Sequence, residues 1–176
     1  MFAIGGFFYI FMYTKNIIKK IESLHDIDQQ SIQLYKSKKL SGLVLDKINL
    51  ENTLILKEII IKHGFPFKNK TSKKTYNSAF LIVQHSNDLA FMEKIRSIFS
   101  KSNDRQINKS DLGYLIDRIN ILKGLPQIYG TQYKNADSRQ ITFFDIKDSK
   151  NINKRRRKLG METFDEYKKK ISKNSE

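Results

Sequence analysis

The chain has 176 residues, of which 39% are hydrophobic, and its 33 basic and 18 acidic side chains give a formal net charge of +15. This length and hydrophobic content suffice for one folded domain with an additional segment, and they exclude an intrinsically disordered chain. Because the sequence contains no cysteine, disulfides, thiolate nucleophiles and cysteine-ligated zinc are excluded as well.

The positive charge does not by itself identify a partner. The basic residues are 26 Lys and 7 Arg, spread along the whole chain among many Ile and Asn residues. This pattern is typical of an A/T-rich coding bias as well as of a binding surface. Attraction to anionic surfaces is expected in either case, because the electrostatic field depends on the charge and not on its origin.

The first 13 residues contain no charged side chain and are followed by three lysines within the next seven positions. A helix that spans a bilayer needs roughly 20 apolar residues, a length that the run approaches only if it extends to Ile18. No basic segment precedes the run and no Ala-x-Ala-like site follows it, which argues against a cleaved signal peptide. We expect residues 1–18 to be a hydrophobic membrane anchor; the alternatives are an element packed on the domain and the end of a longer span. The lysines favour a cytoplasmic, membrane-associated domain by the positive-inside tendency.

Helical periodicity and turn residues predict the organisation of the remaining chain. Residues 19–42 are expected to form a helical stalk or linker, residues 43–170 the globular domain and residues 171–176 a flexible tail. The elements predicted within the domain are a helix that ends at His63 before Gly64, a helical region over residues 75–100 that is either continuous or broken at Ser86 and Asn87, a central helix that starts at Ser110 and ends at Gly124, a hairpin of residues 127–133 with 140–146, and helices over residues 151–159 and 163–171. The predicted fold class is α+β, a mainly helical single domain with one small β-hairpin, preceded by an N-terminal hydrophobic anchor or stalk.

The central helix carries charge on an element whose pattern is otherwise apolar. One apolar stripe consists of Leu112, Leu115, Ile116, Ile119 and Leu122. Tyr114 and Ile121 supply apolar surface on another side, so we expect the helix to be covered on both sides. Asp117 and Arg118 must then either be paired within the fold or belong to a functional site, because an unpaired buried charge is costly. These two neighbours project about 100° apart on a helix, and we therefore expect a different partner for each.

The segment after this helix offers amide and hydroxyl groups. An extended chain would direct Gln127, Tyr129 and Thr131 to one side and Ile128, Gly130 and Gln132 to the other. Side chains that both donate and accept hydrogen bonds suit a polar ligand, although exposed hairpin residues have the same composition.

Four motifs follow one another along the chain: Val83-Gln84-His85, Asp117-Arg118, Gly124-x-Pro126-Gln127-x-Tyr129-Gly130-Thr131-Gln132 and Arg155-Arg156-x-x-Leu159-Gly160-Met161. Their order and spacing resemble the landmarks of an uncharacterised bacterial domain family, one of the numbered domains of unknown function. The resemblance covers roughly Asp46 to Tyr167, including Asn52 and the Gly64-Phe65-Pro66 turn, where the family usually has Gly-Trp-Pro. Relatives often carry an acidic residue two positions after the histidine, where this chain has Asn87. The family has no established activity, so the resemblance implies site positions and no reaction.

The residues and the resemblance together predict a site for a polar or anionic small molecule or a peptide. Because an imidazole ordinarily titrates near working pH, His85 is a candidate general acid or base that Asp88 or Asp117 could orient; the alternative is a hydrogen-bonded core histidine. The candidate catalytic residues are His85, Asp117 and Tyr129, and the candidate ligand-binding residues are Gln84, Arg118, Gln127, Thr131, Gln132, Arg155 and Arg156. No metal and no cofactor is expected, because one histidine with scattered aspartates lacks the paired-ligand spacing of a metal site.

The competing hypothesis is a non-enzymatic module held at a membrane, whose basic surface contacts anionic lipid or nucleic acid. Arg155, Arg156 and Arg157 form a basic run, but no aromatic residues are interleaved with it and no known nucleic-acid-binding motif accompanies it. Nucleic acid is therefore not favoured. The sequence also has no Walker loop, dinucleotide fingerprint or nucleophile elbow, which excludes the commonest enzyme classes. The oligomeric state is left open.

Overall fold

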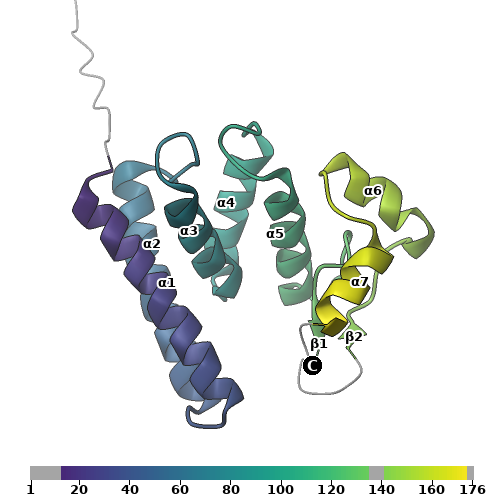
Figure 1. Ribbon diagram of the computed structural model, residues 1–176, viewed down its shortest axis with the longest axis horizontal. Coiled ribbons are helices and arrows are strands. Elements are labelled where there is room, and N and C mark those ends of the chain that lie inside the picture. The colour runs from purple at the N-terminus through teal and green to yellow at the C-terminus, as the bar shows by residue number, and fades with distance from the viewer. Residues whose placement is uncertain (1–12, 135–140, 174–176) are drawn as a thin grey trace, which may run out of the picture. The chain divides into compact units, whose positions relative to one another are not determined.

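The computed structural model describes residues 13–134 and 141–173 (Figure 1). The chain is mainly helical with one small antiparallel hairpin, which confirms this part of the predicted fold class. It divides into two compact units, Met1–Ala79 and Phe80–Glu176. Most of the expected anchor, residues 1–12, lies outside the described residues. Within the described ranges, no helix is both long and apolar enough to cross a membrane.

The first unit is built on two long helices, α1 (Lys15–Lys36) and α2 (Gly42–His63), which lie side by side. Each begins at a hydroxyl cap, where Thr14 accepts from the Ile17 amide and Ser41 from the Val44 amide. Helix α2 ends as predicted at His63, followed by Gly64 with a φ of 77°. Residues 19–42, expected to form a stalk or linker, thus contain most of a helix that packs on α2.

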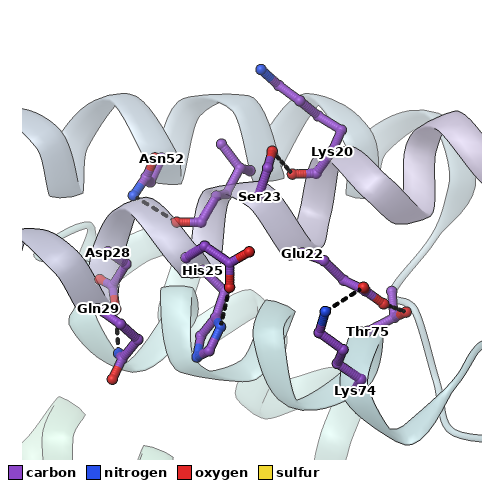
Figure 2. A network of polar contacts seen from close by, with 11 residues as sticks. Lys20, Glu22, Ser23, His25, Asp28, Gln29, Asn52, Lys74 and Thr75 are labelled. Atoms are coloured by element: carbon purple, nitrogen blue, oxygen red, sulfur yellow. Dashed lines mark hydrogen bonds and ion pairs between the residues drawn. The ribbon is translucent and has the colours of Figure 1, made fainter.

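Burial between α1 and α2 holds this pair together. Ile21 and Leu24 of α1 are buried together with Leu56 and Ile60 of α2. Asn52 of α2 is also buried, and its Nδ2 donates to the Leu24 carbonyl at 3.3 Å (Figure 2). The amide side chain thereby avoids the cost of an unpaired buried donor.

A second polar contact joins α1 to the start of α3 (Lys73–His85). The Glu22 carboxylate accepts from the Thr75 hydroxyl at 2.7 Å and lies 2.9 Å from the Lys74 ammonium (Figure 2). Hydrogen bonds from Thr75 and then Lys74 hold the pKa of Glu22 below its usual value. Glu22 therefore contributes stability that is present above the unfolded-state pKa and is lost as pH falls through the folded-state pKa.

Replacing Glu22 with Gln should lower the free energy of unfolding at pH 7 by about 0.5–1 kcal/mol, because the contact lies at the surface and is screened by solvent. The loss should vanish at strongly acidic pH, where Glu22 is protonated in the wild type. Urea denaturation at both pH values measures the difference. Asp26→Asn is the matched control, since Asp26 lies on the same helix with a side chain that is 67% exposed; an equal loss in both variants would contradict the assignment.

The second unit begins within α3, at Phe80, and contains elements shorter than α1 and α2. They are α4 (Leu89–Ser100), α5 (Lys109–Leu122), β1 (Tyr133–Lys134), β2 (Thr142–Phe143), the 3-10 helix η1 (Ser149–Asn151), α6 (Ile152–Lys158) and α7 (Phe164–Lys173). The predicted helical region over residues 75–100 is broken, since α3 ends at His85 and the Asp88 carboxylate caps α4 by accepting from the Phe91 amide at 2.9 Å. Helices α4 and α5 pack against each other.

Helix α5 is covered on both sides, as its pattern predicts. Its buried residues are Asp111, Gly113, Leu115, Asp117 and Ile119. Alternate positions project about 200° apart on a helix, so burial at these positions requires neighbours on opposite sides. The predicted stripe is wrong at Leu122, which is 37% exposed because the helix ends there.

The hairpin is shorter than the sequence predicts. Pairing is limited to Tyr133 with Phe143 and Lys134 with Thr142. Residues 127–132 do not form a strand, since Gly130 has a φ of 69° and the one bridge of Gln127 within the described part of the chain is parallel, to Ile146. The predicted alternation of side chains along residues 127–132 is therefore wrong.

Candidate functional site

Residues 127–132, which follow α5 in the chain, form an irregular segment. Side chains of the domain form hydrogen bonds with many of the backbone polar groups in this segment. Gly124 adopts a φ of 69°, and the Leu125 amide donates back to the Asn120 carbonyl at 2.8 Å, which ends the helix. A buried segment without a regular strand partner needs other acceptors and donors for its peptide groups. Residues from α5, α6 and α7 supply them.

Asp117 supplies the acceptors. Its carboxylate is fully buried and accepts from the amides of Ile128 at 2.6 Å, Tyr129 at 3.0 Å and Thr131 at 3.0 Å. The Thr131 hydroxyl donates to the same carboxylate at 3.0 Å. Burial raises the pKa of Asp117 above its usual value, and these hydrogen bonds act in the opposite direction. The side chain thus takes the place of a neighbouring strand.

Arg155 supplies donors from α6. Its Nε donates to the Ile128 carbonyl at 2.9 Å, and one terminal nitrogen donates to the Lys147 carbonyl at 2.7 Å. The other terminal nitrogen lies 3.3 Å from the Asp148 carboxylate. This arginine therefore joins the segment to the residues that precede η1.

Arg156 makes the corresponding contact one residue further on. Its guanidinium donates to the Tyr129 carbonyl at 2.7 Å and to the Glu162 carbonyl at 2.6 Å, and the side chain is 1% exposed. Burial lowers the pKa of Arg156. The ring of Tyr167 lies 4.9 Å from the guanidinium, and the Tyr167 hydroxyl donates to the Thr131 carbonyl at 3.0 Å.

Gln127 closes the segment on itself. Its side-chain oxygen accepts from the Gln132 amide at 2.9 Å, and its Nε2 donates to the carbonyls of Gln132 at 3.0 Å and Phe144 at 2.8 Å. The side chain is fully buried. It therefore satisfies both backbone polar groups of Gln132 and the carbonyl of Phe144, the residue directly after β2.

Gly130 allows the close packing of this segment. At its φ of 69° a Cβ would lie 2.7 Å from the Phe164 ring and 2.9 Å from Ile152. Any larger residue would combine an unfavourable backbone conformation with a steric clash. This accounts for glycine at that position of the motif.

Seven of the predicted site residues therefore converge on one cluster, which we call the clamp. It consists of Asp117, Gln127, Tyr129, Thr131, Gln132, Arg155 and Arg156. The polar groups described above bind other groups of the protein, most of them in the backbone, so the clamp stabilises the segment. Asp117 forms its hydrogen bonds within the clamp and does not orient His85.

The remaining predicted residues lie at a second place, the corner between α3 and α4. Gln84 and His85 end α3, and Arg118 of α5 donates to Asn87 in the following turn at 3.3 Å. The structure thus confirms that Asp117 and Arg118 have different partners. We call Gln84, His85, Asn87 and Arg118 the corner.

Two hydrogen-bond donors of the corner lack acceptors. The Arg118 Nε and the Gln84 Nε2 are buried without a hydrogen-bond partner among the described residues. Gln84 is 9% exposed, and burial lowers the pKa of Arg118. His85 is partly exposed. The corner therefore differs from the clamp, where the same residue types are satisfied by the protein.

Two contributors were missed by the sequence analysis. Tyr167 completes the clamp, and its only sequence signal is the spacing of four to Ile171, which marks the buried face of α7. Asn87 was noted only as a departure from the family pattern, although it is the residue that contacts Arg118. In the described ranges, no group of three or more His, Asp or Glu side chains is arranged to hold a metal ion.

The fold and the clamp define a mainly helical α+β domain whose irregular segment is held by one aspartate and two arginines. The chain matches the model of a family of unknown function, DUF6624, over residues 20–174, and it belongs to that family. The predicted resemblance to an uncharacterised family is confirmed, and the match extends further toward the N-terminus than the motifs do. Comparisons with curated proteins and with solved structures gave no match.

Proposed function

We propose that this domain binds an anionic small molecule at the corner, with Arg118 and Gln84 as hydrogen-bond donors. The observation that carries the proposal is the pair of buried N–H groups without acceptors. A buried donor left unpaired costs roughly 1–3 kcal/mol, which a ligand oxygen would recover. Phosphate and carboxylate groups fit best, because the planar guanidinium binds two of their oxygens at once.

Asn87 supports a negatively charged ligand. It gives Arg118 a neutral oxygen at 3.3 Å, so the contact does not neutralise the guanidinium. An aspartate at the same place would supply the charge that the proposed ligand brings. The exposed position of Asn87 makes this substitution compatible with the fold.

His85 adds to the corner an imidazole, a side chain that serves as an acid or base in many enzymes. If the ligand is a substrate, His85 is the candidate general acid or base. Asp117 and Tyr129, the other candidate catalytic residues, are not part of this proposal, because the clamp uses the Asp117 carboxylate and the Tyr129 backbone.

Inorganic phosphate, pyrophosphate or citrate, followed by a metabolite set, should raise the melting temperature of the wild-type chain. Asn87→Asp and Arg118→Met should each weaken binding at least about tenfold, which corresponds to about 1.4 kcal/mol. Isothermal titration calorimetry measures the affinity of each variant. Arg105→Met is the control, because Arg105 is an exposed arginine outside the corner.

His85→Gln distinguishes a ligand-binding histidine from a structural one. Retained thermal stability with lost binding or turnover supports the proposal, because Gln keeps polarity and some hydrogen bonding. A loss of roughly 1–3 kcal/mol in stability with unchanged binding would assign His85 to the fold. Anion affinities that are the same in the wild type, Asn87→Asp and Arg118→Met would overturn the proposed site.

A further inference from the structure

Helix α2 carries an apolar stripe on the side away from its buried face. Leu43, Leu50, Leu54 and Ile61 are 84%, 57%, 50% and 70% exposed. Their spacings of seven, four and seven residues place them within about 20° of one line along the helix. Since the other face of α2 is buried, this helix is apolar on two sides, a pattern typical of helices covered all round.

The charges beside the stripe have a definite arrangement. At 100° per residue, Lys47 and Glu58 flank the stripe on one side, and Asp46 and Lys57 flank it on the other, all within about 60° of its centre. Each flank therefore holds one base and one acid, with the base and the acid near opposite ends of the helix. Glu51 and Lys62 lie further out, about 80° and 100° from the centre, so three acids and three lysines border the stripe. This balance lacks the basic face that binds an anionic lipid surface.

We propose that the stripe binds α2 of a second copy of this chain in an antiparallel, two-fold symmetric pair. The two-fold axis of the pair would pass beside position 52 of each α2. Leu50 then lies opposite Leu54 of the second copy, and Leu43 lies opposite Ile61 of the second copy. In antiparallel helix pairs each flank faces the same flank of its partner. Lys47 then meets Glu58 of the second copy.

The opposite flank is complementary in the same way, because Asp46 meets Lys57 of the second copy. Symmetry repeats both contacts, so four ion pairs border an apolar seam. A parallel pair would place Asp46 beside Lys47 of the second copy, so the ion pairs alone do not choose the direction. The helix macrodipoles do, because they attract each other in an antiparallel pair and repel each other in a parallel pair. Charge complementarity thus favours a second copy as the occupant, and the helix dipoles favour the antiparallel direction.

Light scattering coupled to size-exclusion chromatography on the full chain tests the proposal, and a dimer is expected at micromolar concentration. Leu54→Glu should give a monomer, with circular dichroism to verify the fold. Leu125→Glu, at an exposed leucine in the second unit, should leave the dimer intact. Lys47→Glu should weaken the dimer at least tenfold, and the double variant Lys47→Glu with Glu58→Lys should restore it.

Cysteine pairs test the direction, since the native chain has none. Mixed Leu43→Cys and Ile61→Cys chains should cross-link on oxidation, whereas Leu43→Cys alone should not. Cross-linking of Leu43→Cys with itself would overturn the antiparallel arrangement. If the wild-type chain remained monomeric at 100 μM, the proposal that a second copy binds the stripe would be overturned. Binding of the monomeric chain to anionic vesicles would overturn it as well.

Discussion

Replacing Asp117 with Asn should lower the free energy of unfolding by about 3 kcal/mol, because at least one buried amide would lose its acceptor. Asn offers a single acceptor oxygen, and its NH2 group would face the N–H groups of the segment. Three backbone amides and one hydroxyl now share the two carboxylate oxygens. Urea denaturation at pH 7 measures the loss.

Asp104→Asn is the matched control for this substitution. Asp104 forms a surface ion pair with Lys109, and its side chain is 70% exposed. Its replacement should change stability by less than about 0.5 kcal/mol. Hydrogen exchange adds a local readout, since the amides of Ile128, Tyr129 and Thr131 should lose protection in Asp117→Asn. Equal stability and equal exchange in the two variants would contradict the assigned role of Asp117.

Replacing Arg156 with Lys should cost about 3 kcal/mol, because at least one of the two carbonyls that the buried guanidinium binds would lose its donor. A lysine cannot donate to the Tyr129 and Glu162 carbonyls with the geometry of the guanidinium, and it also loses the planar contact with Tyr167. Urea denaturation and the melting temperature measure the effect.

The neighbouring Arg157 provides the control, because it is exposed on the same helix. Arg157→Lys should be neutral within about 0.5 kcal/mol. If both lysine variants were equally stable, the buried contacts of Arg156 would not stabilise the domain. The folded fraction of Arg156→Lys should retain the anion affinity of the corner, which separates a structural arginine from a ligand-binding one.

The clamp and the corner differ in what forms hydrogen bonds with their polar side chains. In the clamp, aspartate, glutamine and arginine side chains bind peptide groups of residues 127–132. In the corner, Arg118 and Gln84 keep buried donors for which the described residues offer no acceptor. Polar motif residues of one chain can therefore stabilise the fold in one cluster and keep hydrogen-bond donors for a ligand in another.

Local sequence determines the ends of several elements of this protein. Ser41 and Gly64 mark the ends of α2, and Gly124 terminates the turn after α5, because hydroxyl caps and left-handed glycines act on the adjacent turn. The separate partners of Asp117 and Arg118 also follow from the sequence, since adjacent helical residues point in different directions.

Only the tertiary structure decided what those partners are. The polarity of Gln127, Thr131 and Gln132 predicts a ligand as readily as a clamp, because composition does not say whether a group is satisfied. The amides that bind Asp117 lie 11 to 14 residues further along the chain, and the Thr131 amide reaches it only after the segment turns at Gly130. Partner choice among buried polar groups is a non-local property, since it depends on which elements pack together, and no local pattern encodes it.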